Sequence, residues 1–457
     1  MSQSNNAVKD LTHGNPISLL LSFSLPLMLG NIFQQLYTFV DALIVGQKIG
    51  AYAMAALGAT EWITFIMFGV IGGITQGCSV VISKYFGNKN QDKLEKSIYS
   101  TYIISIVLAI CFTIIGQLVI YPALILLNTP AEILEYSYLY LKILYAGVPV
   151  TVLYNMLAAI MRALGNSKQP LHAMAIASVC NIVLDLLFII IYQMGIAGAA
   201  YTTVLSQLLA SLYCLLYIRH SQMYRLNTAN RILSKDLLTE QITLGIPMGA
   251  QNMITSIGGL VVQATANSFG VLFVTGYSAA NKLYALLEIA ATSYAQGSLT
   301  FTAQNRGINN TKRIKDGLKA SLFIGAITAI LMSCIMLFAG KWILGLFITE
   351  IGIDANAAIQ IGYNFLTVLA FGFPLLYALY IIRACIQGLG DSFFPMLSSF
   401  IQVIMRVSCA MFLTKIIGHS GIFWGEICAW IGADIFLLFI FIIKTTHFKN
   451  SSSIDHN

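Results

Sequence analysis

The chain has 457 residues, of which 58% are hydrophobic and only 9% are charged, and its mean hydropathy is +0.79. Because a soluble domain carries roughly 25% charged residues, this composition excludes an ordinary water-soluble fold and indicates a membrane protein. The net charge of +7 requires no nucleic-acid partner, since basic loops beside a membrane account for it.

Long apolar stretches follow one another along the chain, separated by short polar turns. Each spanning helix needs about 20 apolar residues, so we expect an all-α membrane protein with about twelve transmembrane helices. The first apolar run is too long for a signal-peptide core, and we expect it to stay as a helix. The expected segments are 17–46, 51–79, 97–121, 131–161, 170–192, 196–218, 239–268, 275–302, 317–347, 355–386, 393–416 and 420–444.

The positions of Lys and Arg predict the orientation of these helices. Most of the 25 basic residues lie in the loops after the even-numbered helices, as Lys84, Lys89 and Lys93 do after the second. Lys and Arg accumulate in cytoplasmic loops. We therefore expect a multi-pass protein of the plasma (inner) membrane with both termini cytoplasmic.

The sequence contains an internal repeat. Pro26 in "LPLMLGN" recurs as Pro247 in "IPMGAQN", a shift of 221 residues, and Pro170, which ends "LGNSKQP", recurs as Pro395, which ends "LGDSFFP", a shift of 225. The motifs that end at Pro170 and Pro395 resemble a helix end followed by a cap and an early proline of the next helix. A repeat of this length indicates two copies of one structural unit.

Each copy contains six of the expected helices, an even number, so both copies have the same orientation in the membrane. Secondary transporters use such parallel repeats, with a substrate cleft between two bundles. We expect an N-terminal six-helix bundle at 1–218, a cytoplasmic linker at 219–238 and a C-terminal six-helix bundle at 239–457.

Motifs for catalysis, cofactors and metals are missing from the sequence. The eight cysteines are scattered singly, the six histidines form no constellation, and no Gly-rich nucleotide-binding loop with its lysine occurs. We therefore expect a protein that is not an enzyme and has no cofactor. Energy for transport would come from a proton or sodium gradient.

The charged residue Asp41 lies near the middle of the first apolar segment. An aspartate there costs about 2.5–3.5 kcal/mol, so it is expected to face a cavity or a partner and to have a function. Tyr37 shares its helix face, and Asn181 and Asp185 share a face of the fifth segment. Amide and hydroxyl oxygens at similar depth complete a predicted cation-binding or proton-binding site of Tyr37, Asp41, Asn155, Asn181, Asp185 and Thr202.

The repeat provides an internal control for this site. The positions that match Asn181 and Asp185 in the second copy are Arg406 and Ala410, and Val262 matches Asp41. A structural role shared by both copies would not produce this asymmetry, which favours a function for the acids. Sodium at Asp41, Asn181 and Asp185, or a proton shared by the two acids, both remain open.

Four further residues have predicted roles. Pro26 removes a backbone hydrogen bond from the first helix and is the expected hinge of that helix. Glu61, Lys282 and Glu288 are the candidate charges of the cleft. Glu61 and Lys282 occupy nearly equivalent repeat positions, so they either pair across the cleft or extend independently to the membrane surface.

Several stretches together resemble the multidrug and toxic compound extrusion (MATE) family. They are "LPLMLGNIFQQLYTFVDALIVG", "RALGNSKQP", "NIVLD" and "GYSAANKLYAL…AQNRG". The resemblance covers essentially the whole chain. Asp41 with Asn181 and Asp185 resembles the DinF-like branch, whose cation site is in the first bundle. The departure at Ala303, where members commonly have Gly, affects only local packing.

The resemblance implies multidrug and organic-cation efflux by antiport, with small, cationic and apolar substrates, membrane lipid as surroundings and a monomeric chain. One alternative is a lipid-linked precursor flippase of the same superfamily, which would need a cleft richer in Lys and Arg. The other is a channel or a non-transporting membrane protein, against which the repeat and the one-sided acid cluster argue.

Overall fold

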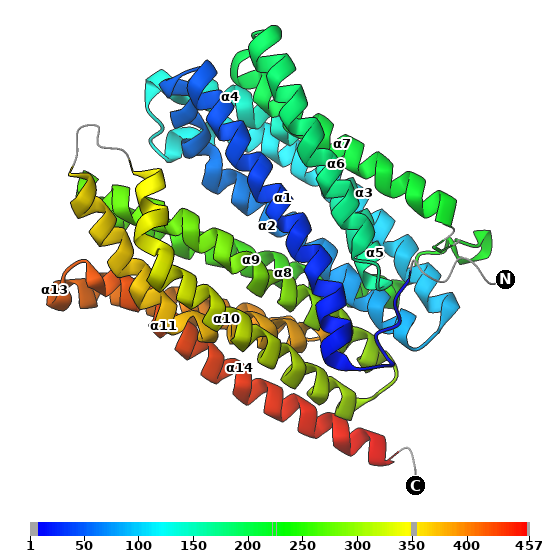
Figure 1. Ribbon diagram of the computed structural model, residues 1–457. Helices are drawn as coiled ribbons and strands as arrows, with labels where there is room; N and C mark the ends of the chain where they lie inside the picture. The colour runs from blue at the N-terminus through cyan, green and yellow to red at the C-terminus, as the bar shows by residue number, and fades with distance from the viewer. Residues whose placement is uncertain (1–7, 222, 225, 349–353, 455–457) are drawn as a thin grey trace. The chain divides into compact units, whose positions relative to one another are not determined.

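The structure is a computed structural model that describes residues 8–221, 223–224, 226–348 and 354–454, the last nine and residue 228 by their backbone only (Figure 1). This part of the chain is helical throughout and contains no strand. The elements are α1 Pro16–Lys48, α2 Ala51–Gly87, α3 Gln91–Leu126, α4 Ala131–Ala146, α5 Val148–Ala163, α6 Lys168–Asp185, η1 Leu186–Ile191, α7 Gly195–Ser221, η2 Thr228–Asn230, α8 Lys235–Asn267, α9 Val271–Gly307, α10 Thr311–Phe347, α11 Ala355–Gly388, α12 Phe393–Ser408, η3 Cys409–Leu413, α13 Thr414–Ile417 and α14 Ser420–Ile454.

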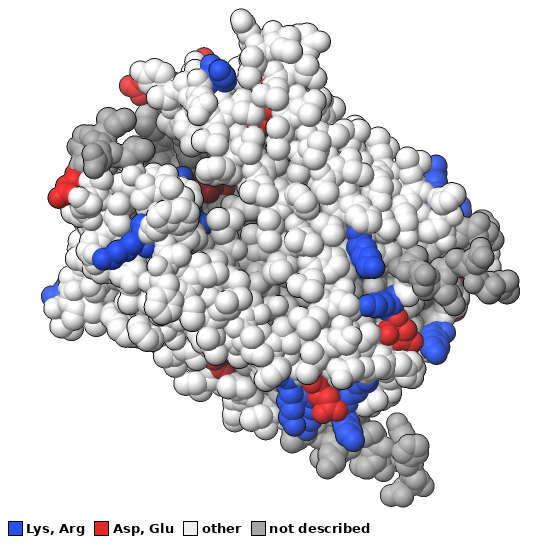
Figure 2. Space-filling view, viewed as in Figure 1, with Lys and Arg blue, Asp and Glu red and all other residues white. Residues whose placement is uncertain are grey.

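The predicted all-α membrane architecture is confirmed, and each of the twelve expected segments coincides with one long helix or one interrupted helix. Within the described residues, nine helices are long and apolar enough to cross a membrane, and α4 with α5 forms a tenth such segment. The two others, α8 and α9, have 33 and 37 residues but are more polar. The face in Figure 2 shows charged side chains mainly near its margins.

Three of the expected continuous helices are interrupted. The segment expected at 131–161 is bent by 49° between α4 and α5, where Pro149 in the first turn of α5 cannot continue the hydrogen bonding of α4. The fifth and eleventh segments change into π-helices, η1 and η3. Apolar periodicity does not report such changes, because the side chains remain equally hydrophobic.

The contacts divide the chain into two compact units, which we describe separately. Unit 1 comprises residues up to Asp10 and Leu25–Gly249, and unit 2 comprises Leu11–Ser24 and the chain from Ala250 onward. The first part of α1 thus belongs to unit 2, and the first part of α8 belongs to unit 1. The bundles predicted at 1–218 and 239–457 stay a prediction, and residues 222 and 225 of the linker and parts of both termini lie outside the described residues.

In unit 1, the first half of α8 packs closely on α2 through glycines. A methyl group on Gly73 would lie 2.5 Å from the backbone nitrogen of Gly249, so the close approach needs a residue without a side chain. Beside this contact Lys84 forms a 2.7 Å ion pair with Glu240, and Gln241 Nε2 donates a 2.8 Å hydrogen bond to the Ser97 carbonyl.

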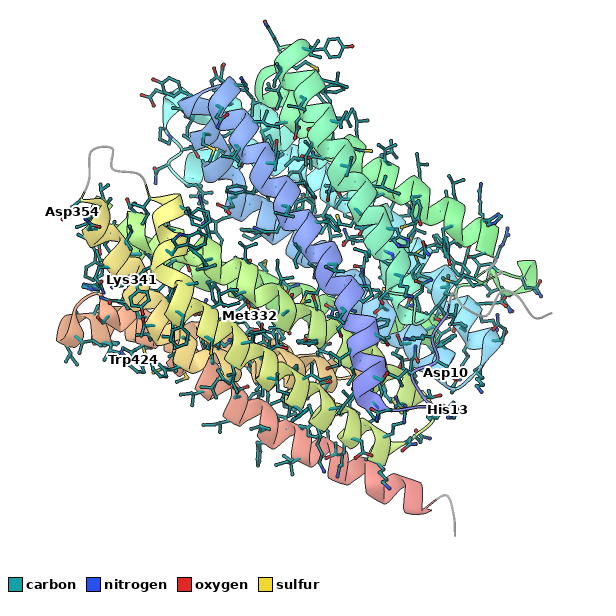
Figure 3. All side chains as sticks on the ribbon, in the orientation of Figure 1. Asp10, His13, Met332, Lys341, Asp354 and Trp424 are labelled. Atoms are coloured by element: carbon teal, nitrogen blue, oxygen red, sulfur yellow. The ribbon has the colours of Figure 1, made fainter. Side chains whose placement is uncertain are left out.

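In unit 2, the segment before α1 is held by the ends of α9 and α10. Leu11 donates its N–H to Gln304 Oε1 at 2.9 Å, and its carbonyl accepts from Asn305 Nδ2 at 3.2 Å and Arg313 Nη2 at 3.1 Å. Gln304 and Asn305 lie inside α9, whereas we expected this helix to end at residue 302. Near the other end of α10, the Lys341 ammonium lies over the ring of Tyr363 on α11, 4.8 Å from its centroid, and Asp354 lies just before α11; Lys341 and Asp354 are labelled in Figure 3.

The two copies share their helix-end chemistry. Asn90 caps α3 by accepting from Lys93 N at 3.0 Å, and Asn310, 220 residues later, caps α10 by accepting from Arg313 N at 3.0 Å. The predicted helix-ending glycines, Gly165 and Gly390, have φ of +81° and +82°. These common features are the scaffold on which the two copies carry different polar residues.

Candidate ion-binding site

Three helices of unit 1 bring the predicted acids and their partners together. Asp41 is on α1, Asn181 and Asp185 are on α6, and Thr202 is on α7, which packs on α6 (Figure 1). Asp41 is 7% exposed, and the other three side chains are fully buried. Charged side chains are buried to this extent only where other groups compensate for the loss of water.

Two interactions connect these side chains. Thr202 Oγ1 donates a hydrogen bond to Asp185 Oδ1 and also to the Ala199 carbonyl, at 2.9 Å. The carboxyls of Asp41 and Asp185 lie close enough for their charges to interact. The predicted approach of α1 to α6 and α7 through these residues is therefore present in the structure.

Four buried polar atoms of this cluster have no hydrogen-bond partner within the described part of the chain. They are Asp41 Oδ1, Asp185 Oδ2 and both amide atoms of Asn181. A buried polar group without a partner costs about 1–3 kcal/mol, and a charged one costs more. Buried groups left without a partner in a cluster are therefore candidates for binding a ligand.

The backbone beside Asp185 is also unusual. The π-helix η1 begins at the next residue, and the Tyr192 N–H donates to the Leu187 carbonyl, five residues back, at 2.9 Å. Single π-turns inside α-helices occur frequently at functional sites. However, η3 occurs at nearly the same place in the second copy, so the π-helix belongs to the shared scaffold and does not by itself define the ion site.

Tyr37 lies next to the acids, as predicted, and two residues that the sequence did not reveal join it. The Tyr37 side chain is 9% exposed and interacts with Asp41, and Gln207 on α7 is within its hydrogen-bonding reach. Tyr140 on α4 interacts electrostatically with Tyr37, Asp41 and Asp185. Its sequence context, "YSYLYLKILY", contains four tyrosines and gives no signal that singles out this one.

Asn155 has a different environment from the other predicted ligands. Its Nδ2 donates to the carbonyl of Thr151, one turn earlier on α5, at 2.9 Å, and Thr151 Oγ1 donates to Gln207 Oε1 at 2.5 Å. Asn155 is therefore linked to the Tyr37 side of the cluster through a chain of hydrogen bonds. Its role as an ion ligand stays a prediction.

The predicted hinge residue lies in α1, and the predicted cleft charges lie on α2 and α9. Pro26 lies inside α1, close to the residue at which this helix passes from unit 2 to unit 1. Glu61 on α2 and Lys282 on α9 are exposed, and their pairing stays a prediction. Glu288 on α9 is half-buried and accepts a 2.5 Å hydrogen bond from the Tyr380 hydroxyl.

The second copy contains polar groups that sequence reasoning left unexplained. Arg406, at the position that matches Asn181, forms a 2.6 Å ion pair with Glu426 on α14. In the sequence, this pair is indicated only by the presence of opposite charges in two expected helices that follow one another along the chain. Val262 and Ala410, which match the two acids, are buried apolar residues, 3% and 2% exposed. The acid cluster therefore has no counterpart at the matching positions.

The donor atoms of the first-copy cluster suit a small hard cation or a proton. Its side chains offer two carboxylates, one amide oxygen and one hydroxyl, and hard cations prefer oxygen ligands. Among the described residues, no group of three or more His, Cys, Asp and Glu side chains is placed to hold a metal ion. The grouping of these oxygen atoms makes the cluster a candidate site for a monovalent cation or a proton.

A comparison with known protein families identifies the family of the chain. The MatE family model matches residues 26–187 and 247–412, which are corresponding parts of the two copies. The chain belongs to the MatE family. The resemblance to MATE transporters seen in the sequence is thereby confirmed, and this multi-pass membrane protein is a transporter and not an enzyme.

Individual relatives of this MatE chain cover nearly its whole length. The "Probable multidrug resistance protein YpnP" of Bacillus subtilis (strain 168) is 29% identical over 414 residues, covering 90% of this chain and 92% of its own. "Multidrug export protein MepA" of Staphylococcus aureus (strain NCTC 8325 / PS 47) is 25% identical over 416 residues, 90% of each chain. The structure described as an "Outward-facing conformation of a multidrug resistance MATE family transporter of the MOP superfamily" superposes with a TM-score of 0.90 at 21% identity, covering 98% of this chain and 100% of that one, and shows the shared fold.

Proposed function

We propose that this protein is a secondary active multidrug efflux antiporter, in which the inward movement of a proton or a sodium ion through the Asp41 cluster drives the export of small organic cations. The observation that carries the proposal is the set of four unpartnered buried atoms on Asp41, Asn181 and Asp185. When the ion leaves the cluster, the charges of these side chains are no longer compensated. Binding and release of the ion can therefore shift a two-state equilibrium between conformations.

The names of the relatives support the substrate class. YpnP and MepA are named for multidrug resistance and multidrug export, and both align over nine-tenths of this chain. We infer that the substrates are small, cationic and apolar, and that the protein acts as a monomer in the plasma (inner) membrane with both termini cytoplasmic. We also infer that it belongs to the DinF-like branch, because Asp41, Asn181 and Asp185 form a cluster in the first copy.

The basic residues of the second copy argue against the lipid-linked precursor flippase. A pyrophosphate site needs free guanidinium or ammonium groups. Arg406 is bonded to Glu426, and Arg383 Nη2 donates to Ser398 Oγ at 3.0 Å and Gln402 Oε1 at 2.7 Å. Both guanidinium groups thus already have partners inside the protein. Of the basic residues predicted for the cleft, this leaves Lys282, and a cleft so poor in Lys and Arg favours a cationic substrate.

The test uses the full chain in inverted membrane vesicles with an imposed proton or sodium gradient and a fluorescent organic cation as substrate. We expect Asp41→Asn and Asp185→Asn each to abolish ion-driven transport at normal expression. If sodium is the ion, Asn181→Ala should raise the sodium concentration needed for half-maximal transport. If a proton is the ion, transport should follow the pH gradient without sodium.

Two controls belong to this experiment. Substitutions Val262→Ala and Ala410→Ser, at the matching buried positions of the second copy, should leave the coupling ion and its dependence unchanged. Transport at the wild-type rate by the double variant Asp41→Asn, Asp185→Asn would refute the site. Dye movement driven by neither gradient would instead refute the antiporter and support the channel alternative.

Helix α1 is the proposed moving element, because it carries Asp41 and contains Pro26. Proline removes the hydrogen bond to the carbonyl four residues earlier and lets a helix bend. We expect Pro26→Ala to leave the protein inserted in the membrane and to slow transport strongly. An unchanged transport rate at equal expression would count against bending at this residue.

A further inference from the structure

Asp434 is a buried carboxyl in unit 2 that the Asp41 site does not use. It lies on α14, inside an apolar span of 26 residues, Ser420–Thr445, and is 5% exposed. Both of its carboxylate oxygens are buried and without a hydrogen-bond partner in the described part of the chain. An ionised carboxylate in this position carries the full cost of its lost hydration.

One cationic group, Arg383 on α11, faces Asp434 without bonding to it. The two charges interact, but the Arg383 Nη2 atom is used by Ser398 and Gln402 on α12, and its Nε is buried without a partner. The guanidinium is therefore held by α12 while the carboxylate remains unbonded. A positive charge so close also makes the position unfavourable for a sodium ion.

The other charged groups on the elements that pack against α14 form ion pairs, are exposed, or lie near the ends of their helices. On α12, Arg406 is paired with Glu426, and Lys444 of α14 itself is paired with Asp391 at 2.6 Å. Lys415 on α13 is exposed. The charged residues of α10 lie in its first turns, at 312–319, and near its end, at Lys341. Arg383 is thus the charged group that acts on Asp434.

Glu426 provides a matched comparison on the same helix. It lies eight residues before Asp434 and is also largely buried, but it accepts a 2.6 Å charge-assisted hydrogen bond from Arg406. Such a bond favours the ionised form of a carboxyl. α14 therefore presents one carboxyl that is satisfied by an arginine and one that is not.

We propose that Asp434 is a proton-binding site of this transporter, separate from the Asp41 cluster, which takes up one proton to become a neutral carboxylic acid in its buried position beside Arg383. Protonation removes the buried negative charge that no bond compensates. The site is separate from the first-copy acids and exists whether or not those acids couple transport.

The test is infrared difference spectroscopy of the full chain in lipid nanodiscs, recorded between alkaline and acidic buffer. The background variant is Asp41→Asn, Asp185→Asn, which removes the first-copy acids. Adding Asp434→Asn should remove the intensity of one carboxyl from the carboxylic-acid C=O stretching band. Adding Glu426→Gln should leave that band unchanged, because the Glu426 carboxylate already accepts a charge-assisted hydrogen bond from Arg406.

An unchanged band in Asp434→Asn would overturn the proposal. It is the result expected if a water molecule bridges Asp434 and Arg383 and both stay ionised. Should Asp434→Asn fail to fold, Asp434→Glu serves instead, and the same band should shift in position; no shift would equally overturn the proposal. Because this readout requires no transport, its failure is distinguishable from a failure of the efflux proposal, which the vesicle experiment decides.

Discussion

The two copies of the repeat share a scaffold and differ in the partners that they provide for buried polar and charged side chains. Both have an asparagine cap, a left-handed glycine, an internal proline and a π-helix at matching or nearly matching positions. In the first copy, Asn181 and Asp185 have buried atoms without partners. In the second, Arg406 replaces Asn181 and bonds to Glu426.

This difference shows how two copies of one fold can satisfy the same buried position differently, with an ion pair in one copy and with unpartnered polar atoms in the other. The arginine of the second copy acts as a cation that is attached to the chain and cannot leave. The first copy lacks such a group, so a cation from solution or a proton is needed to satisfy its acids. Buried polar clusters left incomplete by the chain are typical of binding sites.

The largest expected effect follows from moving the second copy's arginine into the first. Asn181→Arg should place a guanidinium beside Asp185 and satisfy the acids permanently. We expect ion-driven efflux to fall to the level of membranes without the protein, measured as dye transport in vesicles. The thermal unfolding temperature should no longer depend on the coupling ion.

Asn181→Lys, with its narrower side chain, and Asn181→Gln, without charge, are the controls for this substitution. The lysine variant should behave like the arginine variant, and the glutamine variant should retain measurable transport. Normal efflux in Asn181→Arg at equal expression would contradict the idea that an attached cation can occupy the site.

The second prediction removes the attached cation of the second copy. Arg406→Ala leaves Glu426 buried and unpaired, which should lower the free energy of unfolding by about 3–5 kcal/mol. The double variant Arg406→Met, Glu426→Gln removes both charges and should lose much less. Denaturant unfolding in detergent measures both values, and equal losses in the two variants would show that the pair is not the source of the effect.

The third prediction concerns packing that belongs to the scaffold. A methyl group on Gly73 would approach the backbone of Gly249 to 2.5 Å, whereas one on Gly72 would meet no atom within 4 Å. Gly73→Ala should therefore destabilise the protein by about 1–3 kcal/mol through overpacking. Gly72→Ala should be neutral or stabilising by up to about 1 kcal/mol, since alanine favours a helix over glycine.

Thermal unfolding of the Gly72→Ala and Gly73→Ala variants compares these neighbouring positions directly. Both replace a glycine of α2 by alanine, so the gain in helix propensity is common to them and cancels in the difference. Similar unfolding temperatures for Gly72→Ala and Gly73→Ala would mean that α8 does not approach α2 as closely as the structure describes.

The smallest expected effects come from the two helix caps. Asn90→Ala and Asn310→Ala each remove a 3.0 Å hydrogen bond to a backbone N–H. Each should lower the free energy of unfolding by about 1 kcal/mol, and the two losses should be alike. Neither variant should change the ion dependence of efflux. A change of ion dependence in only one of them would show that the shared scaffold is also functionally asymmetric.

Much of this architecture was already predictable from the order of the residues. The apolar segments, their number and the repeat follow from local hydrophobicity and spacing, because a helix in lipid satisfies its own backbone and needs only an apolar length. The candidate role of Asp41 and Asp185 was predictable for the same reason, since a charge in such a segment stands out against its neighbours.

Other features depend on contacts between segments distant in the sequence. The pairing of Arg406 with Glu426, the position of Tyr140 beside the acids and the different surroundings of Asn155 could not be read from spacing. The unsatisfied oxygens of Asp434 likewise become evident only when its neighbours on α11 and α12 are known.

The sequence by itself determined which segments are helices and which of them carry a costly charge, because both properties depend on residues close together in the chain. Only the tertiary structure decided which charges are compensated, since compensation depends on atoms from other helices lying within a few ångströms. Glu426 and Asp434 illustrate this limit, because both are carboxyls about two turns apart on one helix, and the neighbouring helices provide a bonded partner for Glu426 but none for Asp434.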